Sequence, residues 1–263
     1  MNLRIVRALI VKYAFIFSRN TFRALDVTFW PVMDLLVWGF VTVYMLKVSH
    51  AVPSMVTFLI AATILWNVLY RAQQVVSVCF LDDVWSRNLL NIFAAPIRTT
   101  EYIGAAYIVG LLQAVVVVIT LSVLALALYS FNLFGLGLSF ALLFANLLVM
   151  GWAMGLLVIG FILRFGPPAE ALAWAVPFLL QPVSAVFYPV SVLPPWLQPV
   201  AHMVPASHVF EGMRQLLSQG RLDPAHIWCA AALNVLYLAL SAWVFHYFFE
   251  AARQRGYLAK YAA

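Results

Sequence analysis

Long apolar runs alternate along the chain with short connections that carry charges, prolines or both. Six of these runs reach the roughly 20 residues that a helix needs to cross a lipid bilayer. We place them at about residues 29–47, 55–79, 102–129, 134–163, 169–188 and 226–250. The pattern therefore predicts an all-α integral membrane protein, with six transmembrane helices in a single domain over residues 1–263.

The composition supports lipid as the solvent for most of the chain. Of 263 residues, 65% are hydrophobic and only 9% are charged, whereas about a quarter of a typical soluble domain is charged. A soluble fold of this size could not hide so much apolar surface from water. The two cysteines, Cys79 and Cys229, fit small buried hydrophobic residues near opposite membrane faces, so we expect no disulfide between them.

The basic residues predict the orientation of the chain. With a cytoplasmic N-terminus, eleven basic residues fall in cytoplasmic segments: Arg4, Arg7, Lys12, Arg19, Arg23, Arg87, Arg98, Arg164, Arg253, Arg255 and Lys260. The outer connections then hold three: Lys47, Arg214 and Arg221. Because basic residues concentrate on the cytoplasmic side of membrane proteins, we expect both termini in the cytoplasm and the proline-rich stretch after residue 188 outside.

Residues 3–24 combine basic and apolar side chains at helical spacing. Lys12, Arg19 and Arg23 share one side of a helix, with apolar residues elsewhere. This is typical of a helix that lies in the inner headgroup layer. It either only anchors and orients the chain or also touches a cytoplasmic partner. No small-residue cleavage pattern follows, so we expect the segment to be retained.

Two ionisable residues fall inside the apolar runs. Asp34 lies in the first run and Arg71 in the second, where Asn67, Arg71 and Gln74 share a helix face. Their estimated depths agree within roughly 5 Å, at 1.5 Å per residue. We predict an intramembrane Asp34–Arg71 pair; the alternative is that each is satisfied separately at a helix or subunit interface.

The inner connection after the second run carries a short amphipathic pattern. We predict a helix over residues 82–94 that Pro96 terminates. Such a helix in a cytoplasmic loop either rests on lipid or inserts into a groove of a partner protein. Its candidate contact residues are Asp82, Asp83, Val84, Trp85, Arg87, Asn88, Leu89, Ile92, Phe93, Pro96 and Glu101.

The outer connection is rich in prolines and aromatic residues. Pro205 suits the first position of a helix that continues to Leu217, and Gly220 can terminate it. We expect two short re-entrant helices over residues 194–218. In the fourth run, Gly151 and Gly155 form a small-xxx-small motif that predicts close helix packing.

The sequence carries no recognisable catalytic motif. It contains no G-x-x-x-x-G-K-[ST] phosphate loop, no H-E-x-x-H, no Cys–His cluster with metal spacing and no G-x-S-x-G. We therefore expect neither an enzyme nor a bound metal or cofactor, and the basic residues fit lipid headgroups better than nucleic acid.

Two stretches resemble exporter permeases of the type-2 ABC transporter (ABC-2) family. In NLLNIFAAPIRTTEYIGA, Leu89, Pro96 and Glu101 match the family's loop pattern T-L-E-x-L-L-x-T-P-x-S-x-x-E, whereas Asn88, Leu90 and Ala95 depart from it. The outer stretch YPVSVLPPWLQPVAHMVPASHVFEGMRQLL is similar to the family's segment between the last two spans. Its matching residues are Pro189, Leu193, Pro194, Trp196, Leu197, Pro205 and Arg214.

This resemblance implies a role in ATP-driven export across the bacterial inner membrane. The chain would form a homodimer, and residues 82–94 would be the coupling helix that binds an ABC ATPase subunit, where ATP and Mg would reside. The cargo would be a glycan, glycolipid, lipid or drug-like amphiphile. Its path or exit gate would include the following residues: Trp38, Phe187, Tyr188, Trp196, Phe210 and Met213.

Other functions stay open at this point. An ion-coupled secondary transporter would use Asp34 and need no ATPase. A membrane-embedded transferase would need paired polar catalytic residues near one interface, which we do not find in the sequence. A pure assembly scaffold would need no transport path at all.

Overall fold

The computed structural model describes residues 2–48 and 53–254, and in this part of the chain every regular element is a helix. The α-helices are α1 (Leu3–Arg19), α2 (Thr21–Val48), α3 (Pro53–Trp85), α4 (Leu89–Ala94), α5 (Thr99–Tyr129), α6 (Gly137–Phe165), α7 (Leu172–Leu180), α8 (Gln198–His202), α9 (Pro205–Gln219) and α10 (Pro224–Gln254). Short 3-10 turns cover Leu133–Leu136, Pro167–Ala171 and Val190–Val192.

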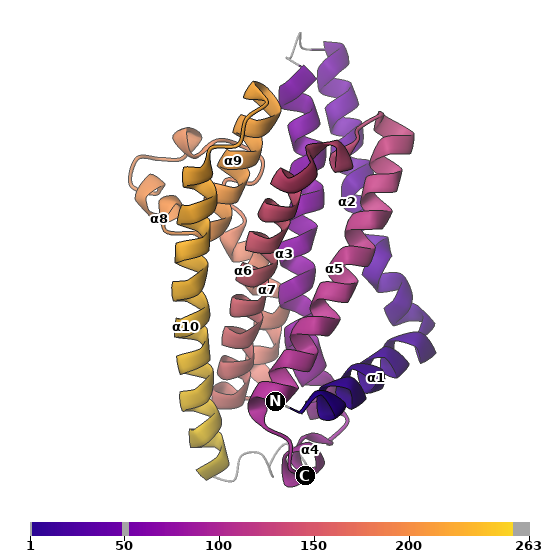
Figure 1. Cartoon of the computed structure of the whole chain (residues 1–263), viewed down its shortest axis with the longest axis vertical. Helices are drawn as coiled ribbons and strands as arrows, with labels where there is room; N and C mark the ends of the chain where they lie inside the picture. Colours follow the sequence, from indigo (N-terminus) through magenta and orange to yellow (C-terminus); the bar gives the residue numbers. More distant parts are fainter. Residues whose placement is uncertain (1, 49–52, 255–263) are drawn as a thin grey trace.

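Five helices of the described chain are long and apolar enough to cross a membrane: α2, α3, α5, α6 and α10. They run roughly along the long axis of the molecule (Figure 1). In the most apolar stretch of α3, 89% of the residues are buried, against 22% in α2 and 17% in α10. Helix α3 therefore lies at the centre of the bundle, and α2 and α10 leave most of their apolar surface on its outside.

The segment predicted as the fifth span is not one long helix. Only Leu172–Leu180 is α-helical there, between the 3-10 turn at Pro167–Ala171 and a series of turns that follows Gln181. Pro167 and Pro168 precede α7 and Pro182 follows its end, whereas Pro177 lies inside it. Proline lacks the N–H of the helix ladder and restricts the residue before it, which explains the short helix. The remaining predicted spans all correspond to long helices.

Close packing of α6 on α3 depends on two glycines. A Cβ at Gly151 would lie 2.7 Å from Ala72 Cβ and from the Leu69 carbonyl oxygen, and one at Gly155 would lie 2.7 Å from Val76 Cβ. The predicted role of this glycine pair in helix packing is thus confirmed, with α3 of the same chain as the partner.

The predicted helix that begins at Pro205 is also confirmed. Pro205 occupies the first turn of α9, and Gly220 ends the helix in the left-handed conformation, with φ of 71°. The apolar face of α9 is buried against α3, α6 and α10. Arg214 and Glu211 on its other face hold the preceding segment: Arg214 donates to the Ala185 carbonyl at 3.1 Å, and Glu211 accepts from the Val190 N–H at 2.7 Å.

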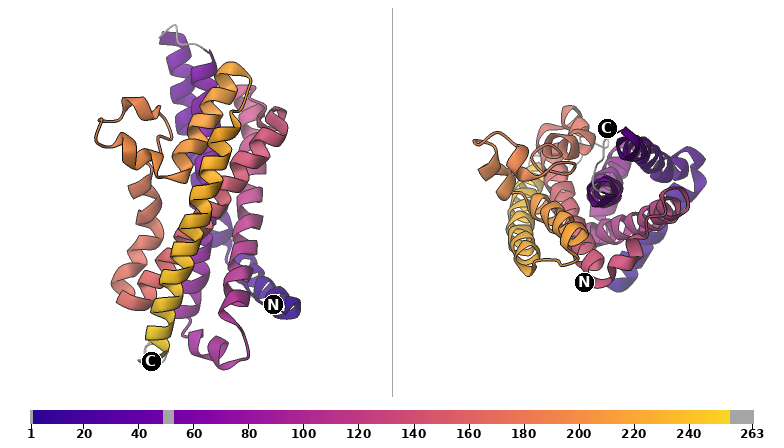
Figure 2. Two further views of the ribbon diagram at one scale, coloured as in Figure 1. Left: turned by 60° about the vertical axis from the view of Figure 1, so that its left-hand side comes forward. Right: turned by 90° about the horizontal axis from the view of Figure 1, so that it is seen from above.

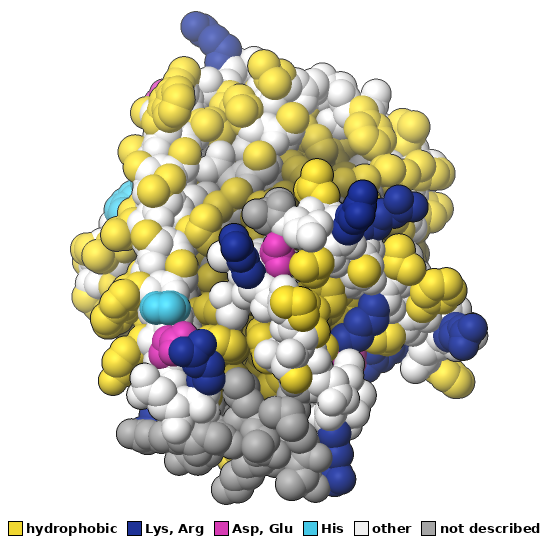
Figure 3. Space-filling model, turned by 60° about the horizontal axis from the view of Figure 1, so that its bottom comes forward, with side chains coloured by type: hydrophobic (Ala, Val, Ile, Leu, Met, Phe, Trp, Pro, Cys, Tyr) yellow, Lys and Arg dark blue, Asp and Glu magenta, His cyan; other side chains and the backbone are white. Residues whose placement is uncertain are grey.

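The lower end of the bundle carries most of the positive charge. Helix α4, the start of α5 and the end of α10 lie at this end, and α1 projects sideways from it (Figures 1 and 2). Lys and Arg side chains are spread over this face (Figure 3). Arg255 and Lys260, which were counted for the predicted orientation, lie outside the described residues.

Candidate functional site

Helix α1 is fixed to the lower end of α3 by buried acids. Asp83 is fully buried; it forms an ion pair with Lys12 and accepts hydrogen bonds from the hydroxyls of Tyr13, at 3.1 Å, and Tyr102, at 2.8 Å. The Asp82 carboxylate accepts hydrogen bonds from both terminal guanidinium nitrogens of Arg23, at 2.5 and 2.6 Å. We call these six residues, Lys12, Tyr13, Arg23, Asp82, Asp83 and Tyr102, the junction.

The junction joins segments far apart in the sequence by a satisfied network. Burial raises the pKa of the Tyr13 phenol well above its usual value, and the nearby Asp83 carboxylate raises it further. Tyr13 therefore stays protonated and donates to Asp83 at any physiological pH. The paired acids therefore join α1, α2, α3 and α5 in one connected network of ion pairs and hydrogen bonds.

The predicted helix over residues 82–94 is interrupted at residues 86–88. Helix α3 continues to Trp85, Arg87 then adopts a positive φ of 53°, and α4 begins only at Leu89. The Asn88 N–H donates to the Asp83 carbonyl at 2.9 Å, which closes the end of α3. The chain therefore turns sharply between the two helices and presents this turn at the lower end.

The structure corrects several of the predicted contact residues in this loop. Asp82, Asp83, Val84, Leu89, Ile92 and Glu101 are buried, so they hold the loop in place and offer no surface to a partner. Phe93 packs between Tyr102 and Phe249, with ring centroids 5.5 and 5.0 Å away. Arg87 and Pro96 are exposed, and Asn88 is half-buried.

Trp85 points back toward the bundle. Its indole N–H donates to Glu170 at 3.1 Å, and its ring lies parallel to that of Trp174, with centroids 6.5 Å apart. Trp174 also lines a cavity of about 490 Å³ between α2, α3 and α7. The end of the loop is thus in contact with a wall of this cavity.

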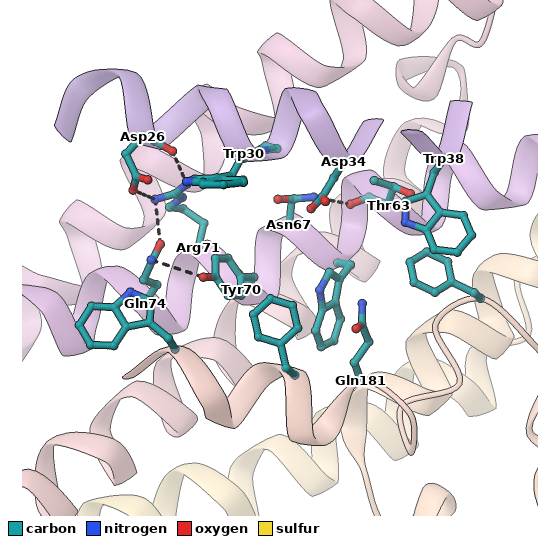
Figure 4. A pocket seen from close by; sticks show the side chains of 15 residues that line it. Asp26, Trp30, Asp34, Trp38, Thr63, Asn67, Tyr70, Arg71, Gln74 and Gln181 are labelled. Atoms are coloured by element: carbon teal, nitrogen blue, oxygen red, sulfur yellow. Dashed lines mark hydrogen bonds and ion pairs between the residues drawn. The ribbon is translucent and has the colours of Figure 1, made fainter. Parts of the chain in front are cut away.

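The cavity takes one face from each of its three helices (Figure 4). Its lining residues are Asp26, Trp30, Pro31, Asp34, Trp38, Thr63, Trp66, Asn67, Tyr70, Arg71, Gln74, Trp174, Phe178, Gln181 and Phe187. Three- and four-residue spacings recur among them: 30, 34 and 38 on α2; 63, 67, 71 and 74 on α3; and 174 and 178 on α7, followed by 181 directly after its end. Residues so spaced share a helix face. The surface combines aromatic rings with carboxylate, amide and guanidinium groups.

Arg71 does not pair with Asp34 as predicted. Its guanidinium lies 3.9 Å from the Asp26 carboxylate and donates to the Asp26 and Val27 carbonyls, at 3.1 and 3.0 Å. Pro31 explains this choice, because it lacks the N–H that would otherwise bond the Val27 carbonyl inside α2. Asp34 instead lies beside the Asn67 amide, away from Arg71 (Figure 4).

The predicted path residues divide into three groups. Trp38 and Phe187 stack at 4.1 Å in the cavity wall, so α2 and the segment after α7 meet there. The Tyr188 hydroxyl donates to the Pro182 carbonyl, and Trp196 is 73% exposed. Phe210 and Met213 are fully buried in the hydrophobic core, so they do not line the cavity in this structure.

Sequence reasoning missed several lining residues, among them Trp30, Trp66, Tyr70, Trp174 and Phe178. The signal was present, because each recurs at helical spacing with a polar residue, as Trp30, Asp34 and Trp38 do. Aromatic residues are also common at membrane interfaces, so this spacing alone does not identify a cavity.

Within the part of the chain that the structure describes, no group of three or more His, Cys, Asp or Glu side chains could hold a metal ion.

Comparison with known proteins agrees with this architecture. The family model of the ABC-2 type transporter matches residues 9–217. A relative described as "ABC transporter G family member 20", from Dictyostelium discoideum, is 28% identical over 185 residues. The match covers 69% of this chain and 24% of that protein, so the chain spans about a quarter of the length of this relative.

Proposed function

The chain belongs to the ABC-2 type transporter family, and from that premise we propose that it is the membrane subunit of an ATP-driven exporter. As an ABC-2 membrane domain the chain is a permease and not itself an ATPase. We propose that an ABC ATPase subunit binds at the lower end of the bundle and holds ATP and Mg there. We also propose a bacterial inner-membrane location, a homodimer and cytoplasmic termini.

One observation carries the proposal: at the lower end, Trp85, the last residue of α3 before the turn, stacks on Trp174 in the cavity wall. A displacement of the exposed turn at residues 86–88 would move α3, to which it is joined directly. It would also move α1 and α2, which the junction links to α3. It reaches α7 through the bond from Trp85 to Glu170. These helices include the three that enclose the cavity, so movement of the turn would change the shape of the cavity.

The cavity supports an amphiphilic cargo. Its volume of about 490 Å³ lies within the range of small-molecule sites, roughly 300–1,000 Å³. Aromatic rings can contact sugar rings, lipid tails or flat drugs, and the polar groups can orient a headgroup. We therefore keep a glycan, glycolipid, lipid or drug-like amphiphile as the proposed cargo, with Trp38 and Phe187 in its path.

The structure changes how the coupling role should be tested. Removing Phe93 would damage the core, so the informative positions are exposed residues of the turn and of α4. We expect Arg87→Glu with Asn91→Lys to abolish ATPase association without unfolding the permease, since both side chains are exposed. Copurification and ATP hydrolysis in the reconstituted complex measure this.

A matched control reverses charge at the other end of the molecule. Arg221 lies in the exposed connection between α9 and α10. We expect the variant Arg221→Glu to leave ATPase association unchanged. If Arg87→Glu with Asn91→Lys still bound the ATPase and supported full ATP-driven transport, the assignment of this loop would be wrong.

A further inference from the structure

We infer that the cavity binds the cationic group of an amphiphile, with Asp34 as its counter-charge and the rings around Asp34 as its walls. The inference rests on the proposed function, because it takes the cavity to be part of the transport path. It narrows the cargo from amphiphiles in general to those with a positively charged head.

The charge balance of the cavity is the first argument. Its acidic and basic lining residues are Asp26, Asp34 and Arg71. Arg71 is held by the Asp26 carboxylate, by the Asp26 and Val27 carbonyls and by Gln74. Among the described residues, no Lys or Arg forms an ion pair with Asp34. One negative charge of the lining is therefore left without a cation.

An uncompensated carboxylate is unusual at this position. Asp34 lies in the middle of a membrane-spanning helix and is nevertheless an exposed side chain. A charge at such a depth costs free energy unless protein, water or a ligand stabilises it. An ionisable residue there therefore indicates a functional site. The neighbouring Asn67 amide supplies polar contact but no positive charge.

The rings around Asp34 provide the second argument. Trp30 and Trp38 lie one helical turn before and after Asp34 on α2, and Trp66 and Tyr70 line the same cavity from α3. Aromatic faces attract cations through the ring quadrupole, and Trp does so most strongly. A carboxylate set among such rings favours an ammonium or phosphonium group, whereas an anionic head would meet repulsion from Asp34.

The outer surface of α2 completes the site for an amphiphile. Val37, Phe40 and Tyr44 of this helix are 60%, 66% and 64% exposed. A ligand whose cationic head lies in the cavity could keep its apolar tail on this surface, in contact with lipid. A neutral sugar head could form a hydrogen bond with Asp34 but would not neutralise its charge, so it fits this surface less well.

The test is direct binding to the permease in lipid nanodiscs, without ATPase or nucleotide. Tetraphenylphosphonium and tetraphenylborate have nearly the same shape and opposite charge, and titration calorimetry measures both after subtraction of empty nanodiscs. We expect saturable phosphonium binding that Asp34→Asn weakens at least roughly tenfold, because the attraction acts in a partly desolvated site. Tetraphenylborate should bind no better to the original chain than to Asp34→Asn.

Two further variants keep the test interpretable. Asp34→Glu retains the charge and should retain phosphonium binding. Asp223→Asn removes the same charge at an exposed position outside the cavity, where Asp223 accepts from the Ala225 N–H at 2.9 Å, a bond that asparagine can also accept. This control should bind phosphonium as the original chain does.

Several results would overturn the inference: no saturable phosphonium binding, binding that Asp34→Asn leaves unchanged, or tighter binding of tetraphenylborate. Competition by a neutral sugar amphiphile that is insensitive to Asp34→Asn would also count against it. Because this readout needs no ATP, its failure leaves ATP-driven transport untouched. Failure of the ATPase to associate would in turn leave the binding result standing.

Discussion

The junction and the cavity differ in whether their acidic side chains have a cationic partner. At the junction, Asp82 and Asp83 are buried and each meets a cation from α1 or α2. In the cavity, Asp34 is exposed to the space between the helices and meets no cation within the described chain. An acid with a fixed partner holds the fold together, whereas an acid without one is available to a ligand.

This comparison predicts that the largest loss of stability follows changes at the junction. Asp83→Asn would leave Lys12 without its partner beside two buried tyrosine hydroxyls. Breaking a buried pair in this way costs about 3–5 kcal/mol. We expect a large fall in the unfolding midpoint of the purified protein, measured by denaturant titration in detergent. Asp34→Asn is the matched change and should shift that midpoint little; similar losses in both variants would contradict the comparison.

The second effect concerns the support that α6 gives to α3. Gly151→Ala places a Cβ 2.7 Å from Ala72 Cβ and from a backbone oxygen. Overpacking of this kind costs about 1–3 kcal/mol. Gly135→Ala is the control, because the nearest atoms to its Cβ would be 3.8 Å away. Equal thermal stability of the two variants would show that the helices separate more easily than the structure indicates.

A third prediction sharpens the assignment of Arg71. In double-mutant cycles we expect Arg71→Met and Asp26→Asn to couple by about 1 kcal/mol, as for a charge-assisted contact. Arg71→Met and Asp34→Asn should couple by less than about 0.5 kcal/mol, as independent sites do. The cycles use the same unfolding midpoints. A stronger coupling with Asp34 would restore the pairing that the sequence predicted.

The smallest expected effect concerns the contact between the loop and the cavity. The rings of Trp85 and Trp174 lie far apart for a stacked pair, at 6.5 Å, so we expect a coupling of about 0.5 kcal/mol from their contact. Trp85→Leu should therefore leave stability nearly unchanged but reduce stimulation of ATP hydrolysis by cargo. Trp196→Leu, at an exposed outer position, is the control and should leave stimulation unaffected.

Local signals in the sequence predicted much of the fold. Pro205 and Gly220 predicted the two ends of α9, because each residue restricts or frees its own backbone dihedral angles. The Gly151–Gly155 spacing predicted a close helix contact. The predicted fifth span over residues 169–188 is apolar throughout, but it contains Pro177 and Pro182, and only Leu172–Leu180 forms an α-helix. Length and hydrophobicity identify membrane segments better than they identify unbroken helices.

The site depended on contacts that no local pattern reveals. Asp82 and Asp83 looked like exposed loop residues, yet their partners Arg23 and Lys12 are 59 and 71 positions away. Similar depths in the membrane favoured a pair of Arg71 with Asp34. Pro31 instead leaves the Val27 carbonyl without its helical partner, and Arg71 donates to that carbonyl. Only the three-dimensional arrangement distinguishes the acid that is already paired from the one that is available.

Transport by purified components tests the central claim most directly. Proteoliposomes would contain the permease with its ABC ATPase subunit, and uptake of a labelled cargo would be followed with ATP or with an imposed ion gradient alone. We predict transport that requires ATP hydrolysis and disappears with Arg87→Glu and Asn91→Lys. Full transport driven by the ion gradient without ATP, and stopped by Asp34→Asn, would contradict the account and favour an ion-coupled transporter.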